Sequence, residues 1–463
     1  MIRTEQQVLD FIKFSQTSDW NIKQIISQVY FSSEYDKVSI GKCIKRIKND
    51  VVVQNDIMYK RLTIKTKGGG VFVRDEVAGK EINTKNQYRV SSGQLAVSKI
   101  DARNGAFGIV PVEAENAIIT GNFWVFDVDT NIVFPQYLVL LLSSDQFTQA
   151  WLECSNGSGN RLYLQEEKFL KYKIPLPSMP EQQALLDKYN ADMKKADEAD
   201  SQSKTLNDGI DSIILEYTNC SKSPKESISS AILKVKPFSK MMNWGAKLNS
   251  NTISPKELFF SKQYRNVSLS SISEVNPTTN YPERIANEKI TFLPMECISD
   301  IYGDISEMRD GIVANAKGYT RFQENDILWA KITPCMQNGK CTIARNLENG
   351  YGYGSTEYHV IRANTEKVLP EYLYCFLRTQ IVRKVAQTYF SGSAGQQRVG
   401  ADFLENLNIP LIPISSDDKS QMTQETMVKQ VFEVKAKIKA LRGEAESLRQ
   451  RAKKEFEEAV FGE

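Results

Sequence analysis

An internal duplication constrains this chain more than any other feature. Pro135 and Pro370 each open a Pro-x-Tyr-Leu segment, and Pro175 and Pro410 each lie in an Ile-Pro-Leu segment, so that both pairs are 235 residues apart. Two matches with the same spacing indicate a repeat of domain size. The repeats of solenoids and propellers are much shorter, at roughly 20–50 residues. The sequence therefore predicts one module that is used twice.

Two shorter patterns also recur in both modules. A Lys-Ile pair follows an apolar run at Lys99 and again at Lys331, and a Gly-Ser pair precedes Arg161 in the first module and Arg398 in the second. The spacing between the two Lys-Ile pairs differs slightly from the spacing between the prolines. Insertions in loops explain such a difference, because extra loop residues cost little folding free energy. We therefore expect equivalent loops in the two modules.

Each module has the pattern of a mixed sheet, with short β-branched and aromatic runs separated by glycine-rich turns. We predict an α+β fold in which two homologous mixed α/β modules with curved sheets are separated by two long antiparallel helices that form a coiled coil. The predicted parts are an N-terminal helical lead-in (1–36), a first module (37–178), a central long helix (179–219), a linker with a second lead-in (220–265), a second module (266–413) and a C-terminal long helix (420–463).

The two long helices carry opposite charge. Apolar residues recur every three or four positions from Met427 to Ala452, which is typical of a coiled coil. Residues 181–216 hold four basic and nine acidic side chains, whereas residues 429–454 hold nine basic and three acidic ones. Opposite charge favours pairing of the two helices with each other. The alternative is that each helix packs only on its own module.

Composition excludes several classes of protein. The longest apolar runs, such as 137–142, are far shorter than the roughly 18 residues of a membrane span. The first residues show no basic head followed by an apolar core, so no secretory signal is expected. The seven cysteines include no Cys-x-x-Cys pair, and we expect reduced thiols in the cytoplasm rather than disulfides or a zinc site.

A search for catalytic groups finds little. His359 is the only histidine, lies in a strand-like segment and has no counterpart in the first module, so a packed imidazole is expected rather than a general base. The sequence has no phosphate-binding Gly-x-x-x-x-Gly-Lys loop, and Asn276-Pro277-Thr278-Thr279 lacks the aromatic residue that would stack on an extruded base. We predict no catalytic residue, no metal site and no cofactor in this chain.

The remaining features fit a polyanion surface. Residues 42–103 hold fourteen basic and six acidic side chains, with Tyr59, Phe72 and Tyr88 among them. Arginine, asparagine and glutamine can form two-point contacts with bases, and glycine-rich turns allow backbone amides to approach phosphate. The candidate DNA-binding residues are Lys60, Arg61, Lys65, Lys67, Arg74, Lys99, Arg103, Asn104, Ser158, Arg161, Arg321, Lys331, Asn338, Lys340, Ser393, Gln396, Gln397 and Arg398.

The duplicated Gly-Ser and Ile-Pro-Leu patterns, followed by Pro180-Glu181-Gln182-Gln183, resemble the specificity subunit of type I restriction-modification enzymes. The resemblance covers nearly the full length and includes Phe461-Gly462 near the end. The second copy differs at 412–418, where the Pro-x-x-Glu-Gln junction is longer and less clear. That difference leaves the start of the C-terminal helix open.

The resemblance implies that each module is a target-recognition domain that reads one half of a split double-stranded DNA sequence, and that the paired helices set the spacer. It also implies two methyltransferase subunits, which use S-adenosylmethionine, and two restriction subunits, which use ATP and Mg²⁺ to translocate and cleave DNA. Catalysis would then reside in those partners.

Three other interpretations stay open at this point. A specificity subunit of a type IIB-like system would also recognise DNA, but with cleavage and methylation in a single partner chain. A stand-alone DNA methyltransferase or nuclease would bind S-adenosylmethionine or metal itself. A coiled-coil scaffold without sequence preference would bind all duplexes equally.

Overall fold

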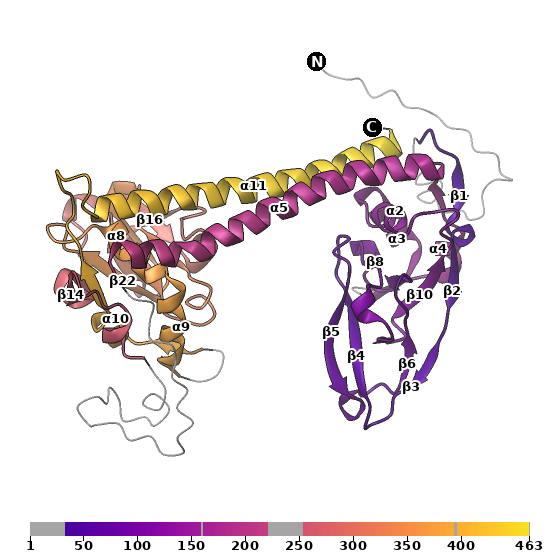
Figure 1. Ribbon diagram of the computed structural model, residues 1–463, viewed down its shortest axis with the longest axis horizontal. Coiled ribbons are helices and arrows are strands. Elements are labelled where there is room, and N and C mark those ends of the chain that lie inside the picture. The colour runs from indigo at the N-terminus through magenta and orange to yellow at the C-terminus, as the bar shows by residue number, and fades with distance from the viewer. Residues whose placement is uncertain (1–32, 159–160, 221–252, 393–395, 463) are drawn as a thin grey trace. The chain divides into compact units, whose positions relative to one another are not determined.

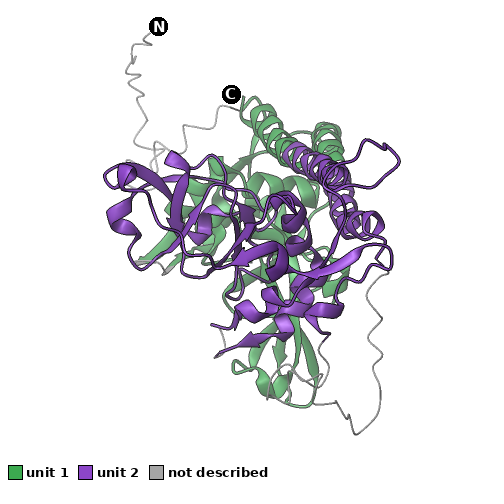
Figure 2. Cartoon of the chain, turned by 90° about the vertical axis from the view of Figure 1, so that its left-hand side faces the viewer, with its two compact units in different colours: residues 1–197, 445–463 green, residues 198–444 purple. Residues whose placement is uncertain are grey.

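The computed structural model describes residues 33–158, 161–220, 253–392 and 396–462 (Figure 1). Residues 1–32 of the predicted helical lead-in (1–36), residues 221–252 of the predicted linker (220–265), and Ser393 lie outside the described residues. The chain divides into two compact units, one formed by residues 1–197 with 445–463 and the other by residues 198–444 (Figure 2).

The first unit contains two larger sheets (Figure 1). The first is antiparallel, in the order β2 (Ile44–Ile47), β10 (Phe123–Val128), β7 (Leu95–Ser98) and β8 (Phe107–Ile109). The second is mixed, in the order β3 (Asp50–Val52), β6 (Asn86–Arg89), β9 (Ile118–Ile119), β4 (Met58–Ile64) and β5 (Val71–Ala78). β4 and β5 form a long hairpin with an irregularity between Arg61 and Leu62, and such irregularities bend and twist a sheet.

Helices cover the first sheet and enclose an aromatic core. They are α2 (Pro135–Leu142), α3 (Asp145–Glu153) and α4 (Glu166–Lys171), and two short antiparallel pairs complete the unit, β1 (Lys37–Ser39) with β13 (Lys173–Pro175) and β11 (Ser155–Ser158) with β12 (Arg161–Leu164). Trp151 is fully buried, with its ring 5.2 Å from that of Phe147 and 5.3 Å from that of Phe169. Aromatic burial of this kind contributes strongly to the stability of the unit.

The second unit repeats the four-stranded antiparallel sheet of the first, whereas, among the described residues, its other sheet has four strands instead of five. Its two sheets have the orders β15 (Ser273–Val275), β22 (Tyr358–Ala363), β19 (Ile327–Ala330), β20 (Cys341–Ile343), and β17 (Arg309–Ile312), β16 (Lys289–Leu293), β21 (Tyr351–Gly354), β18 (Thr320–Gln323). The remaining elements are β14 (Arg265–Ser268) paired with β25 (Asn408–Leu411), β23 (Phe390–Ser391) paired with β24 (Arg398–Val399), and the helices α7 (Leu269–Ile272), α8 (Pro370–Arg378), α9 (Gln380–Thr388) and α10 (Ala401–Glu405).

The duplication read from the prolines is therefore present in the fold. Tyr137 Oη donates a hydrogen bond to the carbonyl oxygen of Pro175 at 3.1 Å, and Tyr372 Oη donates one to that of Pro410 at 2.5 Å. In each unit this bond joins the first long helix of the module to the strand that closes it. The predicted pair of homologous mixed α/β modules is confirmed.

Two long helices follow the modules, α5 (Met179–Tyr217) and α11 (Gln424–Phe461). α5 begins with a capping box, because Glu181 Oε2 accepts hydrogen bonds from the amide and hydroxyl of Ser178 at 2.8 and 2.6 Å. In the first unit the beginning of α5 contacts the end of α11, so that the rings of Tyr189 and Phe456 lie 6.3 Å apart. The helices therefore run antiparallel.

Opposite charges pair along these helices, as predicted. In the first unit Arg451 forms two hydrogen bonds to Asp192, at 2.6 and 2.7 Å. In the second unit the helices are joined instead by a cation and a neutral hydroxyl, because Arg442 Nε donates to Ser203 Oγ at 2.9 Å. α11 also places Phe456 in the core of the first unit, and α5 places Ile214 in that of the second. The alternative in which each helix packs only on its own module is therefore wrong.

Candidate DNA interface

In the first unit, two candidate segments come together. Lys67 N donates a hydrogen bond to Asn104 O at 2.7 Å, and Gly68 N donates one to Gly105 O at 2.9 Å, which joins the β4–β5 turn to the β7–β8 loop. Gly105 has a φ of +71°, and a Cβ there would lie 3.2 Å from the Lys67 backbone, so glycine permits this close approach. The backbone of the basic turn thus lies against the loop that carries Arg103.

Lys99 links this loop to a third segment. Its carbonyl oxygen accepts a hydrogen bond from Leu164 N at 2.8 Å, which places β12 against the β7–β8 loop. Its Nζ lies 5.5 Å from the centre of the Trp124 ring, and burial together with the nearby Arg46 lowers the pKa of Lys99. Ser158 and Arg161 pair through their backbones at the end of this hairpin, but their side chains lie outside the described residues.

Other candidates lie along the β4–β5 hairpin, and some already have partners. Arg61 forms two hydrogen bonds to Asp75, at 2.6 and 2.7 Å, and Arg74 contacts the same carboxylate at 3.1 Å. Lys60 Nζ donates to the carbonyl oxygen of Glu113 at 3.0 Å. Lys65 Nζ, which is nearer the turn, lies 4.6 Å from the centre of the exposed Phe72 ring. Arg61 therefore contributes less net positive charge than a lone arginine.

The second unit joins its loops in the same way. Val399 N donates a hydrogen bond to Lys331 O at 3.0 Å, and Thr333 N donates one to Gln397 O at 3.0 Å. These bonds connect the β19–β20 loop to the β23–β24 hairpin, as the Lys99–Leu164 bond does in the first unit. Two patterns that are far apart in the sequence thus form one surface in each module.

Arg398 does not present a free charge on this surface. Its Nε and Nη2 donate to the two carboxylate oxygens of Glu357 at 2.8 and 2.7 Å, and its Nη1 donates to Gln396 O at 3.0 Å. The Arg398 guanidinium holds the pKa of Glu357 below its usual range. Arg398 is a candidate DNA-binding residue from its sequence pattern, which does not reveal a charge partner 41 residues away in the chain.

Two candidates in the second unit line a polar cleft of about 410 Å³. Lys331 and Arg321 lie on it together with residues 276–280, and the Arg321 guanidinium lies 5.0 Å from the centre of the Tyr281 ring. The residues that line the cleft include no acidic side chain. The cleft therefore combines positive charge with amide and hydroxyl groups, the chemistry that phosphates and base edges require.

The β19–β20 loop carries the two other candidates of the second unit. Asn338 is exposed, and its backbone amide donates to Pro334 O at 3.0 Å within the loop. Lys340 Nζ donates to Met295 O at 2.8 Å and is half-buried. Asn338 is thus available to a ligand, whereas Lys340 also holds the loop to a neighbouring segment.

The strand register alters one equivalence between the modules. Leu164 pairs with Ser155, and Val399 pairs with Phe390 at the corresponding place. Counting along each hairpin, Arg398 then corresponds to Tyr163, and Arg161 corresponds to Gln396. The two arginines that follow the Gly-Ser pairs are therefore not equivalent, although the hairpins that carry them are.

His359 is a packed side chain, as expected. It is 5% exposed, its ring lies 6.2 Å from that of Trp329, and its Nε2 lies 2.9 Å from Val399 O. Burial lowers the pKa of His359. Within the described residues, no group of three or more His, Cys, Asp or Glu side chains is placed to hold a metal ion, and no helix there is long and apolar enough to cross a membrane.

Comparison with known families identifies this arrangement. The type I restriction modification DNA specificity domain matches residues 37–192 and again residues 261–449. The chain belongs to this family of specificity domains. The two matches contain the two modules and parts of both long helices. The unit that occurs twice in this chain is therefore the specificity domain itself.

Known relatives agree with this assignment. The chain is 34% identical over 148 residues to the type I restriction enzyme EcoEI specificity subunit of Escherichia coli, and 35% identical over 156 residues to the EcoAI specificity subunit of the same organism. These matches cover 32% and 33% of this chain, and only 25% and 26% of the relatives. The matched segment thus spans about a quarter of each relative.

A solved structure extends the likeness of the fold to most of the chain. A chain from a study of complex assembly and conformational transition of the type I R-M system superposes with a TM-score of 0.50 at 15% sequence identity. It covers 92% of this chain and 98% of that chain. The likeness to that fold therefore extends over most of this chain.

Each module is joined to its long helix by a buried glutamine, and only the first of the two stands in a motif that the sequence makes clear. Gln182 is fully buried, accepts a hydrogen bond from Phe134 N at 3.0 Å and donates to Pro177 O at 2.9 Å. Gln424 repeats this arrangement in the second unit. Only Gln182 stands in a clear Glu-Gln junction; the order Gln424-Glu425 hid its counterpart.

Proposed function

We propose that this chain is the DNA-recognition subunit of a type I restriction-modification complex, with each module reading one half of a bipartite double-stranded target. The observation that carries the proposal is the repeated joining of a basic loop to a Gly-Ser hairpin, by the Lys99–Leu164 bond in one unit and the Lys331–Val399 bond in the other. Two equivalent surfaces on one chain suit a target of two halves.

The loop chemistry supports two kinds of contact. Lys65, Lys67 and Lys99 in the first module, and Arg321 and Lys331 in the second, would hold phosphates, because the backbone of DNA supplies most of the binding affinity. The amide side chains would read base edges, since asparagine and glutamine can pair with adenine through two hydrogen bonds. These amides are those of Asn104, Asn338, Gln396 and Gln397.

The long helices would set the distance between the two half-sites. α5 has 39 residues and α11 has 38, and at about 1.5 Å per residue each is roughly 60 Å long. A paired antiparallel helix is stiff, so its length would fix the number of base pairs between the halves, as half-site spacing does in dimeric DNA-binding proteins.

Catalysis would come from partner chains in the cytoplasm. The proposed partners are two adenine methyltransferase subunits that use S-adenosylmethionine, and restriction subunits that use ATP and Mg²⁺. The support is the family membership of the chain and the names of its relatives, which are specificity subunits. In this proposal the chain itself positions DNA and performs no chemical step.

The decisive experiment maps methylated adenines in cells that carry the chain with its methyltransferase partner, with and without a matched insertion in the helices. Seven residues would be added to α5 near Asp200 and seven to α11 near Glu444, which lengthens each helix by about 10 Å. The expected result is the same two half-sites with a gap longer by about three base pairs, given about 3.4 Å per base pair. An unchanged gap would exclude the spacer role.

A second arm tests the recognition surfaces. Arg161→Ala should weaken binding of the complex to target duplex, measured by fluorescence anisotropy at moderate salt. Lys173→Ala, an exposed lysine outside the basic stretch 42–103 and outside the loops, is the control and should bind as the parent does. Equal affinity of Arg161→Ala and parent would remove the β11–β12 hairpin from the interface, and equal affinity of the parent for all duplexes would exclude sequence recognition.

A further inference from the structure

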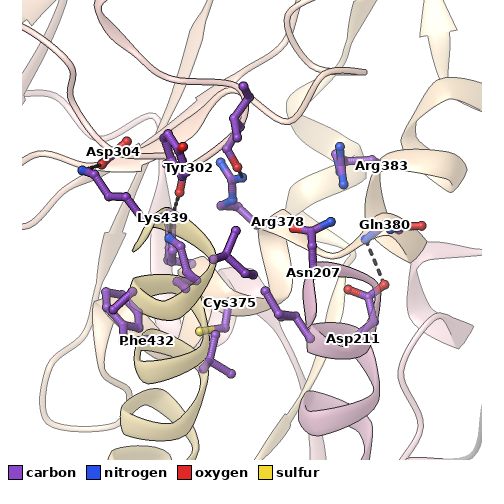
Figure 3. Close-up of a pocket in the computed structure, with 17 residues that line it drawn as sticks. Asn207, Asp211, Tyr302, Asp304, Cys375, Arg378, Gln380, Arg383, Phe432 and Lys439 are labelled. Atoms are coloured by element: carbon purple, nitrogen blue, oxygen red, sulfur yellow. Dashed lines mark hydrogen bonds and ion pairs between the residues drawn. The ribbon is translucent and has the colours of Figure 1, made fainter. Parts of the chain in front are cut away.

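The second unit contains a cavity that the DNA surfaces do not use. It has a volume of about 270 Å³ and lies where the last part of α5 and the first part of α11 meet α8 and α9. Figure 3 shows Arg378 and Asn207 between the two long helices, with Phe432 on the α11 side and Asp211 on the α5 side. Apolar side chains, among them Ile210, form much of its wall.

Four cations line this cavity, and three of them, Arg378, Arg383 and Lys435, form no ion pair with a carboxylate in the part of the chain that the structure describes. Arg378 donates only to carbonyl oxygens, those of Gly339 at 2.8 Å and Ile301 at 3.1 Å being the nearest. Arg383 Nε is buried without a hydrogen-bond partner. Lys435 Nζ contacts the Tyr374 hydroxyl.

The two carboxylates on the cavity wall are already engaged. Asp211 Oδ2 accepts a hydrogen bond from Gln380 N at 2.9 Å, where it caps α9, and Asp304 pairs with Lys439 at 2.8 Å. Arg378 lies near enough to Lys435 to lower the pKa of that lysine, to which burial contributes most. Four cations thus face two carboxylates on a mostly apolar wall, and an excess of positive charge in such a partly buried place is costly unless an anion compensates it.

The fold itself does not require three of these cations. Counting from the equivalent residues Pro135 and Pro370, the first module has Ser143 in the place of Arg378 and Thr148 in the place of Arg383. Counting from Gln182 and Gln424, it has Met193 in the place of Lys435. The same backbone is thus built in the first unit without any of the three charges, so their presence in the second unit calls for a role beyond folding.

We propose that this cavity binds a small organic anion, whose acidic group lies among Lys435, Arg378 and Arg383 and whose apolar body contacts the wall at Ile210. Carboxylates, sulfonates and phosphates on an aromatic or aliphatic body of cavity size share this chemistry. Ligand sites of this type are concave and mostly apolar, with a few polar groups that fix orientation. The site lies at the contact of both long helices, so its occupant would stabilise their pairing in the second unit.

The test uses the full chain and naphthalenesulfonate as the probe, titrated by isothermal calorimetry beside the neutral naphthalenesulfonamide. The parent should bind one equivalent of the anion, and the neutral analogue at least tenfold more weakly. The double variant K435M/R383T, which copies the residues of the first module, should lose at least tenfold in affinity. K435R keeps the charge and should retain binding.

The control is K437M, because Lys437 is an exposed lysine on the same helix and its removal changes net charge equally. K437M should bind the anion as the parent does. If K435M/R383T is poorly folded by circular dichroism, the single K435M variant gives the same comparison. Equal affinity of K435M and parent, or equal binding of the charged and neutral probes, would overturn the proposal.

Discussion

Gln424 Nε2 donates a hydrogen bond to the carbonyl oxygen of Ile412 at 2.9 Å, so that the first residue of α11 is tied to the chain that has just left the second module. The same side chain accepts a hydrogen bond from Leu369 N at 2.8 Å. Because Gln424 is fully buried, these bonds are shielded from water. One amide therefore connects the long helix, the closing segment and the start of α8.

Replacing this amide should destabilise the protein. Gln424→Ala leaves the Leu369 amide and the Ile412 carbonyl without partners, and each buried unsatisfied group costs about 1–3 kcal/mol. We expect a loss of about 2–4 kcal/mol in the free energy of unfolding, measured by urea denaturation. Gln182→Ala should cost a similar amount. Gln183→Ala is the control, since Gln183 is exposed, and the stability of this variant should match that of the parent. If Gln424→Ala were as stable as the parent, the hydrogen bonds of Gln424 would not contribute to stability.

Removal of one phosphate-binding lysine should lower the salt dependence of DNA binding. Each phosphate contact contributes a slope of about −0.9 to the logarithm of affinity against the logarithm of salt. Lys331→Ala should therefore reduce the magnitude of this slope by about one for target and unrelated duplexes alike. Lys317→Ala, an exposed lysine of the same unit, should leave the slope unchanged. Identical slopes for Lys331→Ala and parent would place Lys331 outside the DNA contact.

Release of Arg398 from Glu357 should strengthen DNA binding. Glu357→Gln removes the negative charge that neutralises the Arg398 guanidinium, so we expect affinity for any duplex to rise about threefold to tenfold at low salt, with a slope that grows by up to about 0.9. Glu366→Gln removes an exposed charge of the same unit and should have little effect. Weaker binding by Glu357→Gln would show that the ion pair itself is needed on the surface, and unchanged binding would place Arg398 outside the DNA contact.

The stability effect of Lys435 should depend on pH. Burial lowers the pKa of Lys435 from 10.5 to about 8, so between these values the unfolded chain binds more protons than the folded one. The free energy of unfolding then rises with pH across this window, and the cost of the buried charge is complete below pH 8. At about 1.4 kcal/mol per pKa unit, Lys435→Met should stabilise the chain by about 1–3 kcal/mol at pH 7.

The same comparison at high pH provides the check. Buried tyrosines and cysteines also titrate there, but they are common to variant and parent, so the difference between the two reports Lys435 alone. Urea denaturation at pH 7 and pH 10 should show a stability gain for Lys435→Met that shrinks toward zero at the higher pH. A gain of the same size at both values would contradict the lowered pKa.

Much of the fold could be read from local patterns. The repeated prolines marked the two modules, and the apolar seam of α11 marked its pairing, because Met427, Ala445 and Ala452 recur at helical spacing and are all buried. The charge difference between the helices indicated the partner of each, and Arg451 and Asp192 bear this out. These features depend on residues that are near in the chain or repeated in one frame.

The candidate site was less accessible from sequence. Arg398 is a candidate DNA-binding residue from its sequence pattern, yet Glu357 neutralises it, and Gln424 escaped notice because its neighbours are in a different order from those of Gln182. The cations proposed to bind the anion lie on separate helices and form no motif. In each instance the decisive neighbour is distant in sequence.

The sequence alone determined that one domain occurs twice, that a long helix follows each copy, and that the two helices differ in charge, because periodicity and composition are properties of the chain itself. Only the tertiary structure decided which loops join into a surface, which arginine is neutralised, and where an excess of positive charge lines a cavity. Those outcomes depend on distances between segments that the strand register and the packing of the helices set.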